Sequence, residues 1–130
     1  MAEITRSTTA SPDASTSMYA RNTSGLVAAV DIAVGQACYI TSAGLVALST
    51  GAAANVAAAF RGLAARPAKA GQPVTLLGAG SRWKYGSALT PGASYYVSGT
   101  VPGGLADAAS TGGTSVVAYA IDTTDIMVVG

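Results

Sequence analysis

The chain has 130 residues, which is enough for one ordinary domain. Charged residues make up 10% of it, the formal net charge is +1, and histidine is absent. This sparse charge excludes the basic surface of a nucleic-acid-binding protein, and without histidine the chain lacks the commonest metal ligand and general base.

Half of the chain is hydrophobic, but much of that half is alanine. Alanine and glycine bury little area per residue, so we expect a thin core and modest stability for an isolated chain. A surface of small residues with few charges suits packing against protein, and we therefore expect a homo-oligomer. No apolar run approaches the roughly 20 residues of a membrane span, and no signal peptide is expected.

Residues 1–24 are rich in serine and threonine and show no hydrophobic period. This composition predicts an extended N-terminal arm that is either disordered or ordered by a partner. Met18, Tyr19 and Arg21 form its one adhesive patch, since tyrosine and arginine are enriched at interface anchors. Arg6 is a further candidate for partner binding. The β-rich domain is predicted to span residues 25–130.

From residue 25 onward, short apolar runs are bounded by Gly, Pro or Ser, a pattern typical of antiparallel strands. We predict a first strand over residues 25–30 and a hairpin whose turn is at residues 42–44. Residues 49–65 are expected to form a loop or one helical turn and then a strand. A closing hairpin is predicted around residues 122–124.

One local device occurs three times, at Gly35, Gly71 and Gly92. Each glycine makes a tight turn, and an alternating strand follows it. The segments around Gly35 and Gly92 align over their whole strands, and each continues to a Gly-Leu pair that begins at Gly44 or Gly104. Eight or nine short strands with almost no helix predict an all-β fold, either a small β-barrel or a sandwich.

The search for chemistry finds no catalytic group. The carboxylates of the domain lie beside turns, where they cap backbone groups, and Asp122 and Asp125 alone are too few to hold Ca²⁺. Residues 78–81 are glycine-rich but lack the lysine and the helix of a phosphate loop. Cys38 lies in an apolar run and is interpreted as a small buried hydrophobe. We therefore predict no enzyme, no cofactor and no metal.

Trp83 and Tyr85 alternate along one strand and should face the same side. Three interpretations stay open for them: core filling, a protein-binding hot spot, or a platform that stacks sugar rings. Both are counted among the candidate partner-binding residues.

Four segments carry a resemblance to a known family: residues 31–39 (DIAVGQACY), residues 62–75, residues 89–98 (LTPGASYYVS) and residues 126–129. From about Leu26 to Val129 the chain resembles the small head decoration, or capsid cement, proteins of tailed bacteriophages. The resemblance implies a β-rich domain, often a trimer, that binds the outer capsid and locks neighbouring major capsid subunits. It implies no catalytic residues.

Two functions are therefore considered. The first is a structural virion protein on the outer capsid surface, made in the host cytoplasm, with the major capsid protein as partner and a homotrimer as the favoured assembly. The second is a tail or fibre module that binds carbohydrate on Trp83 and Tyr85.

Overall fold

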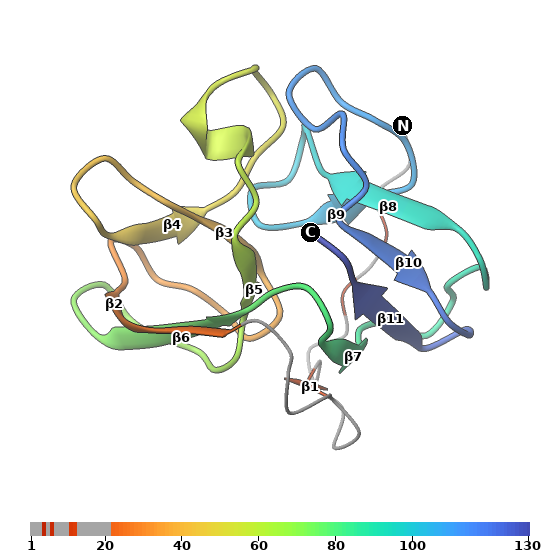
Figure 1. Ribbon diagram of the computed structural model, residues 1–130, viewed down its shortest axis with the longest axis horizontal. Helices are drawn as coiled ribbons and strands as arrows, with labels where there is room; N and C mark the ends of the chain where they lie inside the picture. Colours follow the sequence, from red (N-terminus) through yellow and green to blue (C-terminus); the bar gives the residue numbers. More distant parts are fainter. Residues whose placement is uncertain (1–3, 5, 7–10, 13–21) are drawn as a thin grey trace.

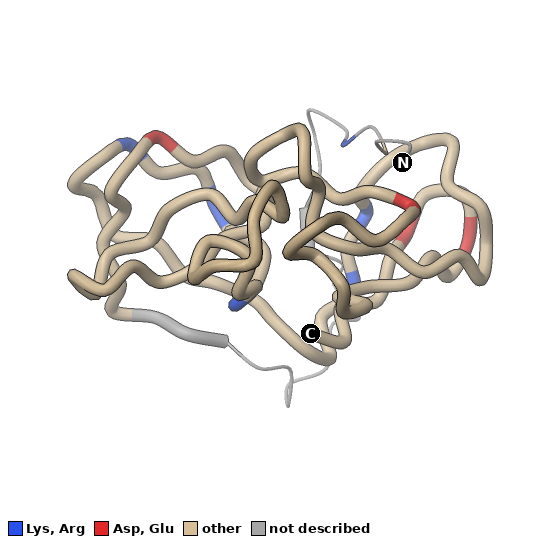
Figure 2. Tube along the Cα trace, turned by 90° about the horizontal axis from the view of Figure 1, so that it is seen from above, with Lys and Arg blue, Asp and Glu red and all other residues tan. Residues whose placement is uncertain are grey.

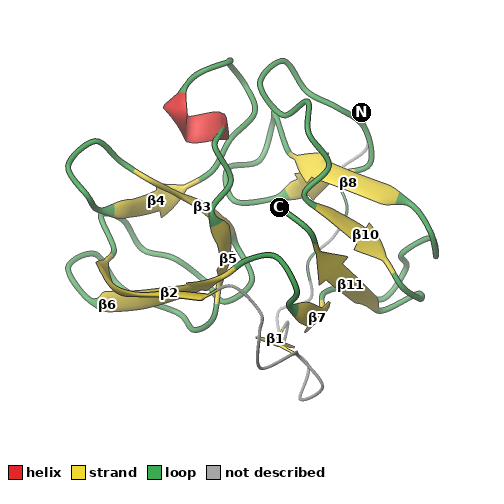
Figure 3. Ribbon diagram, viewed as in Figure 1, coloured by secondary structure: helices red, strands yellow, loops and turns green. Residues whose placement is uncertain are grey.

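The computed structural model describes residues 4, 6, 11–12 and 22–130. The predicted all-β fold is confirmed, and the only helix among these residues is the short 3-10 turn η1 (Val56–Ala58) (Figure 3). Two antiparallel sheets lie side by side (Figure 1). Neither sheet closes into a barrel within the described part of the chain, so the architecture agrees with the predicted sandwich.

Each sheet is built from one half of the sequence. The first lobe, residues 22–77, contains the strands β2 (Asn22–Val27), β3 (Ala37–Ile40), β4 (Val46–Leu48), β5 (Gly62–Ala64) and β6 (Pro73–Leu77). The second lobe, residues 82–128, contains β7 (Arg82–Lys84), β8 (Ser94–Val97), β9 (Leu105–Ala106), β10 (Ala118–Ala120) and β11 (Asp125–Val128). A short strand, β1 (Ser11–Pro12), pairs with the outer edge of β7.

The two lobes repeat one topology. The first sheet has the order β2-β6-β5-β3-β4, and the second has the order β7-β11-β10-β8-β9 next to β1. The registers match as well: Ala37 pairs with Leu63 in the first lobe, and Ser94 pairs with Tyr119 at the corresponding place in the second. The predicted alignment of Gly35 with Gly92 is therefore the local sign of a duplicated five-stranded unit.

Five strands begin directly after the same kind of turn. In each turn the N–H of the fourth residue donates to the carbonyl of the first, and the third residue is a glycine with φ between 79° and 91°. Every non-glycine residue described has a negative φ, so these are type II turns. The glycines are Gly35, Gly71, Gly80, Gly92 and Gly103. Three of them were predicted, whereas the predicted equivalence of Gly44 and Gly104 is wrong, because the left-handed residue is Gly103.

Four of these turns are fastened to a neighbouring strand by a reciprocal pair of hydrogen bonds. The glycine N–H donates to a strand carbonyl, and the N–H of that strand residue donates to the carbonyl of the residue after the glycine. In the first lobe, Gly35 and Gln36 hold Ala64 in this way, with N···O distances of 2.9 and 3.0 Å. The other three turns hold Ala28, Val128 and Ala120. The repeated device therefore sets where each strand starts and which strand it lies beside.

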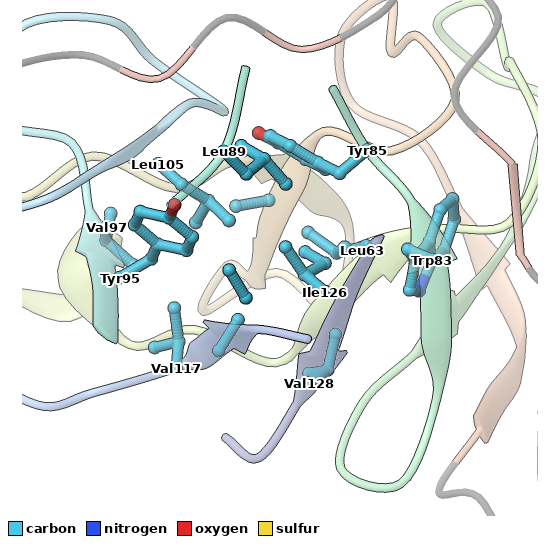
Figure 4. Close-up of a cluster of buried hydrophobic side chains, with 13 residues drawn as sticks. Leu63, Trp83, Tyr85, Leu89, Tyr95, Val97, Leu105, Val117, Ile126 and Val128 are labelled. Carbon is cyan, nitrogen blue, oxygen red and sulfur yellow. The ribbon is translucent and has the colours of Figure 1, made fainter. Parts of the chain in front are cut away.

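Strand alternation divides the interior into two clusters. In β3 and β5, Cys38 and Ala64 point into the small core of the first lobe, while Ala37 and Leu63 point into the larger core of the second. Figure 4 shows Leu63 among the side chains of the second lobe, close to Ile126. The first sheet is thus covered on both faces along its inner strands, and one face is the contact between the lobes.

The structure differs from the sequence prediction at the N-terminus. The strand expected at residues 25–30 begins at Asn22 and ends at Val27, because its first residues pair with the end of β6. Three described pieces of the predicted arm also touch the domain: Ile4, Arg6 and β1.

The duplication supplies a matched pair of substitutions. Leu63 is fully buried between the lobes, so Leu63→Ala should lower the free energy of unfolding by about 2–5 kcal/mol. Tyr119 occupies the corresponding register position and is 40% exposed, so Tyr119→Ala should change it by less than about 0.5 kcal/mol. Urea unfolding in dilute solution measures both values. A loss of less than about 0.5 kcal/mol for Leu63→Ala would show that the lobe contact contributes nothing.

Candidate interaction surface

The described residues contain no cluster of three or more His, Cys, Asp or Glu side chains that could hold a metal ion. Cys38 is fully buried, as predicted, and its Sγ donates to the Gln36 carbonyl at 3.3 Å. Burial raises the pKa of this thiol to about 12. The thiol therefore stays protonated at neutral pH and does not act as a nucleophile.

The two carboxylates that were considered for Ca²⁺, Asp122 and Asp125, hold the turn between β10 and β11. Asp122 Oδ1 accepts hydrogen bonds from the N–H groups of Thr124 and Asp125, both at 2.8 Å, which is the capping role the sequence predicted. Asp125 accepts from Arg82 Nε at 2.9 Å, and Arg82 also lies 3.7 Å from Asp122. Both carboxylates thus complete a turn that is tied to β7.

Trp83 and Tyr85 are both fully buried. They line the core of the second lobe (Figure 4), and Trp83 Nε1 donates to Ser81 Oγ at 3.2 Å. Of the three interpretations left open, core filling is therefore correct. Neither ring is available to stack on a sugar or to anchor a partner, so their place among the partner-binding residues is wrong.

The described part of the arm fastens the two lobes. The N–H of Ile4 donates to the Leu105 carbonyl at 3.2 Å in the second lobe, where the side chain packs on the core. Arg6 Nη1 donates to the Val34 carbonyl at 3.0 Å in the first lobe. Arg6 therefore has a contact within its own chain. The other predicted arm residues, Met18, Tyr19 and Arg21, lie outside the described residues.

A pocket of about 520 Å³ lies between two of the glycine turns of the first lobe. Ile32 and Ala68 join these turns by a pair of backbone hydrogen bonds of 2.7 and 2.9 Å. The Oε1 atoms of Gln36 and Gln72 accept from the first residue of their own turns. The amide oxygens are thus committed to holding the turns, and the two charged residues that line the pocket, Lys69 and Asp31, lie 3.7 Å apart as an ion pair.

Exposed apolar side chains are the feature that sequence reasoning missed. In the part of the chain that the structure describes, eight large hydrophobic residues are between 36% and 58% exposed: Val27, Val30, Leu45, Val56, Val101, Val116, Tyr119 and Val129. Charged residues are few along the described trace (Figure 2), and they include the pair of Lys69 with Asp31 and the group of Arg82 with Asp122 and Asp125. For Tyr119 the exposure could have been predicted from strand alternation, because this residue lies between two alanines that both face inward. These exposed side chains are distributed over both halves of the chain.

No protein-family model matches the chain, and no curated protein matches it either. No described helix is long and apolar enough to cross a membrane.

The capped turn predicts a specific pH dependence. The backbone N–H of Thr124 is the first cause that holds the pKa of Asp122 below its usual value, followed by the N–H of Asp125. A carboxyl whose folded pKa is lowered stabilises the fold above its unfolded pKa, and this contribution is lost as the pH falls through the folded pKa. Asp122→Asn keeps an acceptor oxygen but removes the charge.

We therefore expect the wild-type protein to be more stable than the Asp122→Asn variant at pH 7. The difference should shrink as the pH falls below about 4. Thermal unfolding of both proteins across this range measures it. A difference that stays constant with pH would mean that the charge of Asp122 has no part in holding the turn.

Proposed function

We propose that this protein is a structural virion protein that binds the outer surface of a phage capsid and cements neighbouring major capsid subunits. The observation that carries the proposal is the surface: eight large apolar side chains are exposed among the described residues, and the chain has only seven basic and six acidic residues. On this proposal the protein acts by binding alone. The resemblance of residues 26–129 to capsid decoration proteins points to the same role, in the virion, after synthesis in the host cytoplasm.

Binding alone is sufficient for cementing. A protein that binds the closed shell, and not the separated subunits, stabilises the shell by about 2.7 kcal/mol per site at 100 times its dissociation constant. Copies linked in an oligomer, with a trimer favoured, release together only rarely and so add avidity. The expected result is a shell that better resists heat and the internal pressure of its DNA.

The experiment removes this protein from particles and then adds it back. Particles without it should release DNA at a lower temperature, and re-addition should restore the release temperature of the intact particle. Release can be followed with a DNA-binding dye during heating. Identical profiles for stripped and restored particles would contradict the cement function.

The arm patch can be tested with a substitution that keeps the described contacts of the arm. Deleting residues 1–20 would also remove the contacts of Ile4 and Arg6, so a double substitution, Met18→Ala with Tyr19→Ala, is more selective. We expect at least about tenfold weaker capsid binding, as for other interface anchors, and an unchanged melting temperature. Thr111→Ala, at an exposed polar site of the second lobe, is the control. Unchanged decoration of shells by the double variant would make the patch dispensable.

The carbohydrate-binding alternative relied on Trp83 and Tyr85, and the burial of both rings leaves it without its stacking residues. Binding of the purified protein to a glycan array would restore that alternative.

A further inference from the structure

The duplicated unit presents the same row of side chains twice, in two different environments. In the first lobe, Ala37, Leu63 and Leu77 are cross-strand neighbours on one face of the sheet. Ala37 and Leu63 are fully buried there, and Leu77 is partly buried, because the second lobe covers this face. This face is therefore the place where one unit of the fold packs on the next.

The corresponding row of the second lobe is open. Ser94, Tyr119 and Met127 take the positions of Ala37, Leu63 and Leu77 in matching registers. Ser94 is exposed, Tyr119 is 40% exposed and Met127 is partly exposed. None of these three residues belongs to either hydrophobic cluster of the described chain.

The centre of the open row is apolar. Val129 lies two residues after Met127 and therefore on the same side of the strand, and it is 46% exposed. Its N–H donates to the Val117 carbonyl at 2.9 Å, so it continues the ladder beside β10. We call Tyr119, Met127 and Val129 the outer patch. Arg82, opposite Met127, borders it with its charge compensated by Asp122 and Asp125.

Repeated units that stack on one another normally end in a polar face. Here the end face carries Tyr119, Met127 and Val129 beside the polar Ser94 and the paired Arg82. Tyrosine, methionine and arginine are enriched in protein interfaces. We propose that the outer patch is the surface on which a second copy of this chain packs. The partner is inferred from the first lobe, where the corresponding face is covered by a unit of this same fold.

This inference rests on the proposed cement function, in which several copies act together on the shell. It can be tested without capsids, on the purified full chain, by sedimentation velocity over a range of protein concentrations. The wild-type chain should sediment as an oligomer. Tyr119→Arg and Val129→Arg should each raise the dissociation constant of that oligomer by at least about tenfold, because each places a charge within an apolar contact.

The matched control is Leu45→Arg, which places the same charge on an exposed apolar site of the other lobe, in the turn between β3 and β4. This variant should assemble like the wild-type chain. Circular dichroism and melting temperature establish that each variant is folded. If Tyr119→Arg does not fold, the dissociation constant of the Val129→Arg variant tests the outer patch by itself.

A monomeric wild-type chain, or an oligomer that survives both patch substitutions, would overturn the inference. If that monomer still decorated shells, the cement function would stand and only the second copy would be wrong. If Tyr119→Arg abolished decoration by a monomeric protein, the outer patch would belong to the contact with the capsid subunit instead.

Discussion

A glycine in the third position of a turn is the constraint on which the remaining structure depends. Its φ near +80° is strained for any residue with a Cβ atom, and it points the backbone N–H at a neighbouring strand. The reciprocal hydrogen bonds at Ala64 and Ala120 then place the next strand in one register. Register determines which side chains face inward, so the division of Ala37 and Cys38 between two cores follows from the turn at Gly35.

The two cores are unequal, and this inequality explains the arrangement of the lobes. The first core is made largely of small side chains around Cys38 and Val46, whereas the second holds the single tryptophan and the buried Tyr85 and Tyr95. A lobe with so little bulk gains stability by burying its second face as well, and Leu63 makes that contact. Ile4 and Arg6 reinforce it, because each bonds to a different lobe.

Local signals predicted much of the fold. The hairpin β3–β4, the strand β8 and the closing hairpin were all visible as apolar runs between turn residues. The burial of Trp83 and Tyr85 could not be predicted in this way. Alternation shows that residues share a face of the sheet, but it does not show which face is covered. Strand order depends on pairing between distant segments, so only the Gly35–Gly92 match hinted at the duplication. The contacts of Ile4 and Arg6 are single bonds in a polar segment and leave no periodic pattern.

The shared strand order has a consequence for how the chain reaches its native state. Two tandem units with the same pairing scheme compete for each other's strands during folding, and misassembly between them is the characteristic error of repeat proteins. The chain reduces this competition by giving corresponding positions different bulk: Cys38 in one unit corresponds to Tyr95 in the other, and Leu63 to Tyr119. A strand in the wrong lobe would then leave a void or an overlap. The divergence between the two halves thus disfavours the pairing of a strand with the sheet of the wrong lobe.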